Sequence, residues 1–195
     1  SSPLLVGDEL VVVSGGEDAG PSLLAYRQSD GEEVWRTEDT VGGAYSSPRL
    51  ATLQGEPCIL NVHGRGLSGV SPADGRILWN FEIDSNFPKV AQPHVLPDDR
   101  VLFTASYQQG SHLLRVTRDG GGWAIDPIWE SSRMKTKFSS ASPIGGHAYG
   151  LDEGTFACID LETGDRVWKD GRYGFGQHLH VGEHILLLGE RGTLY

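Results

Sequence analysis

Two sequence markers recur in step along the 195 residues of the chain. The first is a Pro that follows a small or polar residue and precedes apolar residues: Pro3, Pro48, Pro93 and Pro143. The second is a Trp near the end of each unit: Trp35, Trp79, Trp129 and Trp168. The Pro residues are 45, 45 and 50 positions apart, and the Trp residues 44, 50 and 39. Two independent markers with one period predict structural repeats of about 45 residues.

Each unit has the pattern of short strands. Similar apolar runs occupy the same slot in successive units: Leu10–Val13, Ile59–Val62, Val101–Thr104 and Ile185–Leu188. A turn pair then precedes the Trp, as at Asp30-Gly31 and Asp74-Gly75, where both residue types tolerate a positive φ. No stretch has a convincing helical period. The units therefore predict blades of four antiparallel strands, and a β-sandwich would not explain why Pro and Trp recur in register.

Three units contain an eleven-residue box with a small residue first, Gly seventh and Trp last: Ala25–Trp35, Gly69–Trp79 and Cys158–Trp168. This box resembles the tryptophan-docking motif of the quinoprotein-type (pyrroloquinoline-quinone-like, BamB-like) β-propeller repeat family. The resemblance implies that each Trp packs between blades on a neighbour's small residue and Gly. The docking residues it predicts are Ala25, Gly31, Trp35, Gly69, Gly75, Trp79, Trp129, Cys158, Gly164 and Trp168.

The sequence departs from the family pattern at two places. Only Asp160 retains the Asp that the motif has at its third position, where Arg27 and Ser71 stand in the other copies. The third unit carries an insertion between Asp119 and Trp129, and Trp123 lies inside it.

The predicted fold is an all-β propeller of the quinoprotein type with four-stranded antiparallel blades in a partial ring of about four and a half blades. Residues 1–195 are expected to form a single β-propeller segment. Its expected blades span residues 1–44, 45–89, 90–138, 139–174 and, incompletely, 175–195. We interpret the chain as an arc of a longer ring, whose open blade edges could pair with further blades or with another chain. A closed four-bladed ring is the alternative.

The formal charge of −10 argues against nucleic-acid binding and against docking on an anionic membrane, and no apolar run is long enough to span a bilayer. Cys58 and Cys158 both lie in apolar runs, which is typical of buried free thiols. No metal site is predicted: His178, His180 and His184 are close in sequence, but their spacing is a weak metal-binding pattern.

The leading functional hypothesis is a non-catalytic scaffold that binds a protein partner or a small polar ligand, without a cofactor. Its candidate ligand-binding residues stand near each innermost strand, at the rim of the expected funnel: Tyr45, Lys89, Gln92, His94, Lys137, Phe138, Phe175, Gln177 and His178. One alternative is a fragment of an alcohol or sugar dehydrogenase with pyrroloquinoline quinone and calcium, although no adjacent Cys pair or calcium cluster could be placed. A carbohydrate-binding propeller is the other. The resemblance alone implies a periplasmic or extracellular location.

Overall fold

The computed structural model describes residues 1–8, 10–15, 20–85 and 87–195, with the backbone alone for Val11. The described chain forms five antiparallel sheets in which consecutive strands are neighbours. The strands of the first two sheets are β1 (Leu4–Val6), β2 (Leu10–Ser14), β3 (Leu23–Arg27), β4 (Glu33–Arg36), β5 (Arg49–Leu53), β6 (Glu56–His63), β7 (Gly66–Val70) and β8 (Ile77–Glu82). Those of the others are β9 (His94–Leu96), β10 (Arg100–Ala105), β11 (Gly110–Asp119), β12 (Gly122–Ser131), β13 (Ser142–Ile144), β14 (His147–Asp152), β15 (Thr155–Asp160), β16 (Arg166–Asp170), β17 (Gln177–Val181) and β18 (His184–Leu188).

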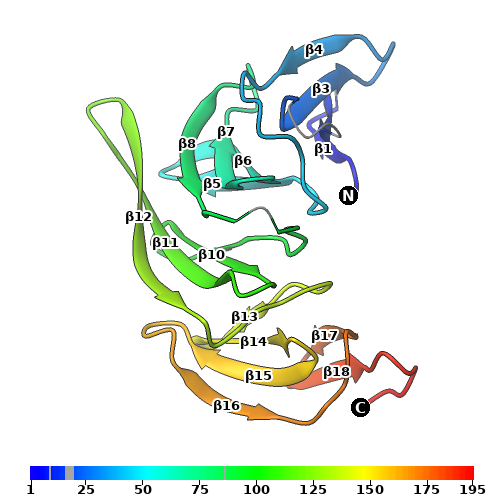
Figure 1. Ribbon diagram of the computed structural model, residues 1–195. Helices are drawn as coiled ribbons and strands as arrows, with labels where there is room; N and C mark the ends of the chain where they lie inside the picture. The colour runs from blue at the N-terminus through cyan, green and yellow to red at the C-terminus, as the bar shows by residue number, and fades with distance from the viewer. Residues whose placement is uncertain (9, 16–19, 86) are drawn as a thin grey trace.

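The sheets succeed one another around a C-shaped arc (Figure 1). The first four have four strands each and the fifth has two, which confirms the predicted partial propeller. Apolar side chains pack chiefly between neighbouring sheets: one buried cluster joins the first blade to the second, another the second to the third, and another the third to the fourth. The interior of this protein is therefore a set of interfaces between blades.

Two Trp residues dock across these interfaces on the turn of the next blade. The Trp35 ring lies against Gly75, where an added Cβ would stand 2.5 Å from ring atom Cε3, and its Nε1 donates to the Pro72 carbonyl at 3.1 Å. Trp129 repeats the arrangement on Gly164, with Nε1 donating to the Leu161 carbonyl at 2.9 Å.

The small residue of the box lies in the same blade as its Trp, whereas the family pattern implied a neighbouring blade. Ala25 pairs with Trp35 across β3 and β4, so it belongs to the same blade as the indole. Gly69 pairs in the same way with Trp79, and Cys158 with Trp168. A β-bulge follows the first box position in each copy, which brings the Trp opposite the small residue.

The other two repeat-marking Trp residues, Trp79 and Trp168, have no glycine of a following blade beneath them in the described chain. Trp79 is buried beside the long β11–β12 hairpin, which carries Trp123 and Ile125 to the same core. Trp168 is 41% exposed and contacts the rings of Tyr149 and Phe156. The box sequence alone did not distinguish these environments.

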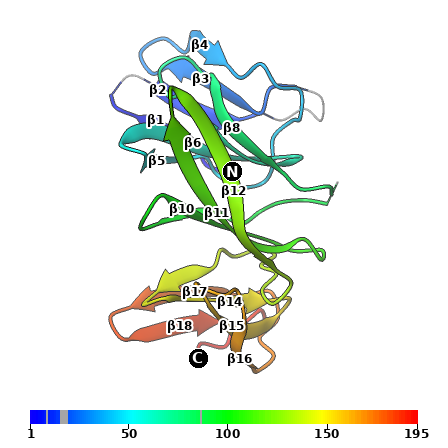
Figure 2. The ribbon, with the colours of Figure 1, turned by 90° about the vertical axis from the view of Figure 1, so that its left-hand side faces the viewer.

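The arc has two faces at the ends of its strands (Figure 2). We call one the crossover face: it holds the connections between blades, residues 37–48, 83–93, 132–141 and 171–176, and the turns after β6, β10 and β14. Backbone hydrogen bonds tie the two sets together, as from Ile83 to Arg65 at 2.8 Å and from Glu153 to Lys135 at 3.2 Å. The opposite turn face holds the turns after β3, β5, β7, β9, β11, β13, β15 and β17.

Candidate functional site

Three aromatic side chains surround one ammonium group on the crossover face, and a fourth aromatic ring stacks on one of the three. Phe87 stacks on Tyr107, with ring centroids 5.2 Å apart, and Phe138 meets Phe175 edge to face at 5.7 Å. Lys137 Nζ lies 4.7, 5.2 and 4.5 Å from the ring centroids of Tyr107, Phe138 and Phe175. We call these five residues the aromatic cluster. Phe87, Phe138 and Phe175 are 55, 52 and 37% exposed, so the cluster presents apolar surface to solvent.

The tight turn between β10 and β11 places Tyr107 in the cluster with a strained backbone. Tyr107 and Gln108 have φ of 53° and 67°, and the turn closes with a hydrogen bond from Gln109 to the Ser106 carbonyl at 3.1 Å. Such two-residue turns favour Asn and Gly, because larger L side chains are disfavoured at positive φ. The corresponding turn of the next blade has Glu153 and Gly154 at these positions. Only one of these two turns, therefore, holds a bulky aromatic residue in the left-handed region.

Lys89 fixes the connection that carries Phe87. Its side chain is 1% exposed, and Nζ donates to the carbonyls of Gly64, Ser85 and Phe87 at 2.9, 3.0 and 3.3 Å. Burial lowers the pKa of this ammonium. The sequence placed Lys89 among the ligand-binding residues of the rim, whereas the structure places it in the interior as a support for the loop.

Asp152 anchors the connection that carries Lys137. Its carboxylate is fully buried, accepts from the Lys135 backbone at 3.0 Å and pairs with Lys135, Arg166 and Lys169. Burial alone would raise the pKa of Asp152, but the hydrogen bonds from Lys135 and Lys169 outweigh it and lower the pKa. Two buried charged side chains, Lys89 and Asp152, thus each hold one of the two neighbouring connections that carry the aromatic cluster.

Other predicted rim residues join neighbouring blades. Gln92 Nε2 donates to the Ser47 carbonyl at 3.3 Å, and Gln177 Nε2 donates to the Phe138 carbonyl at 2.8 Å. Tyr45 is 69% exposed, and its backbone N–H donates to the Lys89 carbonyl at 3.1 Å. The two glutamines therefore have structural bonds, while the Tyr45 ring is available at the surface.

The two predicted histidines lie on the innermost strands β9 and β17. His94 Nδ1 is 3.4 Å from Arg49 Nη1, and His178 Nε2 is 2.9 Å from Ser142 Oγ. Burial, the Arg49 charge and then His178 lower the pKa of His94 to about 4, and burial lowers that of His178. Both rings are therefore neutral at pH 7. His94 Nε2 and His178 Nδ1 are buried without a partner in the described structure.

The structure brings Lys137, Phe138 and Phe175 together, as three of the predicted rim residues. Sequence analysis missed Phe87 and Tyr107. Phe87 could have been found as an aromatic residue in a Pro-containing connection. Nothing in the sequence marks Tyr107, because its place depends on an unfavourable φ.

Outside the aromatic cluster, the described residues include two thiols and potential metal ligands. Cys58 and Cys158 are buried free thiols, and burial raises the pKa of Cys58 to about 12. Among the described residues, no group of three or more His, Cys, Asp or Glu side chains is placed to hold a metal ion. In the same part of the chain, no helix has the length and apolar character that crossing a membrane requires.

The fold and the repeated box have a match among known protein families. A family model described as "Outer membrane protein assembly factor BamB" matches residues 1–170. The chain belongs to this family. No curated protein matches it closely enough to add a named relative.

Solved structures show the same fold. BamB from Moraxella catarrhalis superposes with a TM-score of 0.57 at 15% identity, covering 99% of this chain and 56% of that one. The computationally designed Ika8 protein gives 0.61 at 14% identity, covering 97% and 55%. A Bacteroides caccae protein of unknown function gives 0.54 at 15% identity, covering 95% and 71%. The chain thus spans just over half the length of the first two structures.

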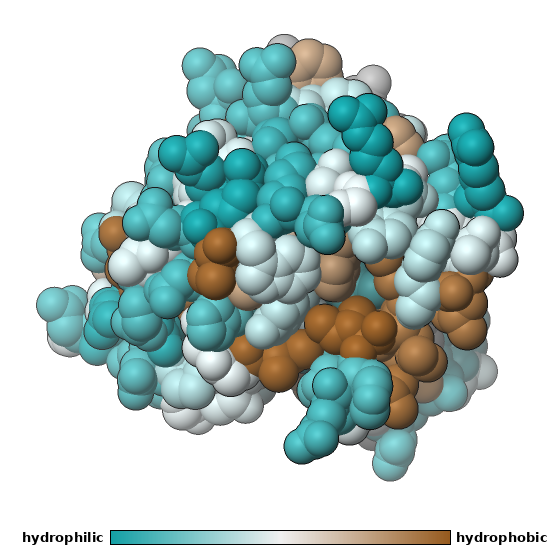
Figure 3. All heavy atoms as spheres, turned by 90° about the horizontal axis from the view of Figure 1, so that it is seen from below, coloured by the Kyte–Doolittle hydropathy of each residue, from teal (hydrophilic) through white to brown (hydrophobic). Residues whose placement is uncertain are grey.

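A second apolar surface lies on the last sheet. Pairing of β17 with β18 puts four apolar residues on one side, and all four are exposed: Leu179, Val181, Leu186 and Leu188. Figure 3 views this end of the arc and shows apolar atoms gathered in one patch. Leu187 and Tyr195 exchange two backbone hydrogen bonds of 3.0 and 2.8 Å, so the last residues run along β18. Pairing of this end with a further blade or another chain stays a prediction.

Proposed function

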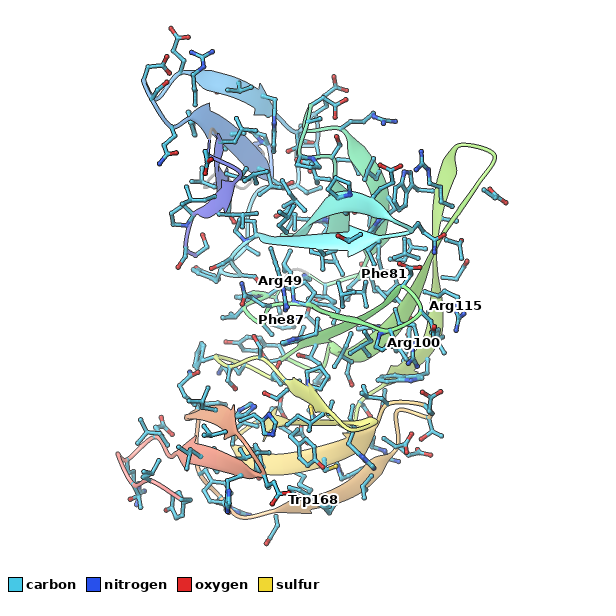
Figure 4. The ribbon with its side chains drawn as sticks, turned by 180° about the vertical axis from the view of Figure 1, so that it is seen from behind. Arg49, Phe81, Phe87, Arg100, Arg115 and Trp168 are labelled. Atoms are coloured by element: carbon cyan, nitrogen blue, oxygen red, sulfur yellow. The ribbon has the colours of Figure 1, made fainter. Side chains whose placement is uncertain are left out.

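We propose that this chain is a non-catalytic scaffold that binds a protein partner through the aromatic cluster on its crossover face. The observation that carries the proposal is the cluster itself: three exposed rings from three connections and the half-buried Tyr107 of a strained turn, with the connections held by Lys89 and Asp152. Rigid exposed aromatic residues are the usual anchors of protein interfaces, since they bury large areas at a small cost in side-chain entropy. Figure 4 labels Phe87, which lies on the connection between β8 and β9.

The family gives the proposal its setting. The family description refers to outer-membrane protein assembly, and we propose the same setting for this chain, with a periplasmic or extracellular location. A binding role needs only the surface described above, without a cofactor, a metal or a catalytic side chain.

Site-specific photo-crosslinking tests the proposal. The chain is produced in its native cell with benzoylphenylalanine in place of Phe87, and separately in place of Arg76, an exposed residue of the turn face. We expect a discrete protein adduct from position 87 after irradiation and none of the same mass from position 76. An adduct pattern shared by both positions, or no adduct from position 87, would contradict the proposal.

The two alternative functions give different signals. Saturable, calcium-dependent quenching of Trp fluorescence by pyrroloquinoline quinone would replace the scaffold with a quinone-dependent dehydrogenase fragment. Retention on a polysaccharide column that Tyr45→Ala abolishes would favour carbohydrate binding, since exposed aromatic rings at Tyr45, Phe138 and Phe175 could stack on sugars.

A further inference from the structure

Lys137 differs from the other three lysines of the chain in what surrounds its ammonium group. Lys89 donates to three carbonyls at 3.3 Å or less, and Lys135 and Lys169 pair with Asp152 at 2.7 and 2.5 Å. Within the described residues, Lys137 Nζ has neither a carboxylate partner nor a hydrogen-bond acceptor, and only aromatic rings approach it.

The contrast is sharpest within one connection. Lys135 and Lys137 are two residues apart, yet the first is neutralised by Asp152 and the second stands among Tyr107, Phe138 and Phe175. Aromatic faces attract a cation but do not accept its three N–H groups as oxygen atoms do. The ammonium therefore retains donors for an incoming anion, at the centre of an exposed apolar surface.

We infer that Lys137 receives a single carboxylate from the partner, carried by an acidic side chain with aromatic neighbours in the partner's sequence. This inference rests on the proposed function and names the chemistry that the aromatic cluster selects. Partial removal of water by the surrounding rings strengthens the ion pair relative to one on an open surface.

The charge of the whole chain limits the partner further. With a net charge of −10, the chain as a whole repels a long acidic segment, so a single carboxylate at Lys137 is favoured over an acidic run. One carboxylate flanked by aromatic rings fits both conditions. Its rings would pack against Phe87, Phe138 and Phe175, which already present exposed faces.

A pair of peptides that differ in one charge tests the inference. The probes are acetyl-Gly-Phe-Glu-Phe-Gly-amide and the same peptide with Gln in place of Glu, and their binding to the chain is measured by calorimetry at 0.15 M salt. We expect at least a tenfold preference for the Glu peptide. Lys137→Met should reduce the preference below twofold, while Lys137→Arg, which retains the cation, should preserve it.

Arg76→Met is the matched control, because it removes the same charge from the turn face and should leave the preference unchanged. Equal binding of the two peptides to the unaltered chain, failure of the Glu peptide to bind at 1 mM, or persistence of the preference in Lys137→Met would overturn the inference. Tighter binding of acetyl-Gly-Phe-Phe with a free carboxyl terminus than of the Glu peptide would overturn the assignment to a side chain.

The outcomes separate the two proposals. If the Phe87 crosslink forms while the peptides bind equally, the partner surface stands and the carboxylate assignment fails. If no Phe87 crosslink forms, the proposed function itself fails.

Discussion

At the scale of single residues, Trp35 and Trp129 act through contact with a glycine of the next blade, Gly75 and Gly164. The sequence indicated the residue types, because a small residue, a Gly and a Trp recur at fixed spacing. The family resemblance implied that both the small residue and the Gly come from a neighbouring blade, but the small residue lies in the same blade as its Trp, because of the bulge after Ala25. The Gly contact does lie in the next blade for Trp35 and Trp129, which pack on Gly75 and Gly164.

Gly75 and Gly31 provide a matched test of this contact. Both have nearly the same φ, 74° and 75°, but Gly75 faces the Trp35 ring and Gly31 has nothing within 4 Å of an added Cβ. We expect Gly31→Ala to cost about 1 kcal/mol for the backbone and Gly75→Ala about 3 kcal/mol, because the ring must also shift. Urea denaturation measures both. Equal costs would mean that the Trp35 contact contributes nothing.

His94 predicts a loss of stability in acid. Its pKa in the folded chain is about 4, below the ordinary value of 6.5, so the unfolded chain binds the proton more tightly. Its contribution is complete above pH 6.5 and is lost as pH falls toward 4, by at most about 3 kcal/mol. Denaturation at pH 7.5 and 4.5 should show a smaller acid-induced loss in His94→Gln than in the unaltered chain. Identical losses in the two proteins would show that protonation of His94 does not contribute to the acid-induced loss of stability.

At the scale of elements, the blades could be predicted and the contents of their connections could not. Pro and Trp spacing indicated units of four strands, and the insertion before Trp129 indicated an irregular third unit. The structure shows that the insertion lengthens β11 and β12 to ten residues each and carries Trp123 onto the second blade. The Tyr107 turn gave no such signal, because tertiary packing overrides its local preference.

The strain in that turn can be relieved by a substitution. Gln108 has a φ of 67°, so Gln108→Gly should stabilise the chain by about 1 kcal/mol without removing the Tyr107 ring. The reciprocal change, Gly154→Gln in the corresponding turn, should destabilise it by at least as much, because a Cβ there would lie 3.3 Å from Gly174 Cα. Thermal melting measures both. Destabilisation by Gln108→Gly would show that the turn is not strained.

At the scale of the whole molecule, the partial ring follows from the repeat, but the candidate site does not. The sequence placed Lys137, Phe138 and Phe175 near one rim from their distance to the innermost strands. The contacts between connections depend on the path that each connection takes beyond the ends of the strands. Hydrogen bonds made by side chains such as Lys89 and Asp152 fix that path. The aromatic cluster joins residues from 87 to 175, which no local pattern relates.

The central claim is that the crossover face, and the aromatic cluster in particular, is the partner-binding surface. Hydrogen–deuterium exchange of the chain, alone and in the complex isolated from its native cell, tests it most directly. The account predicts slower exchange on binding in residues 87–89, 106–109, 137–138 and 173–175, with no change in the turn-face residues 71–76 and 161–165. Protection of the turn face with unchanged exchange at the four crossover segments would contradict it.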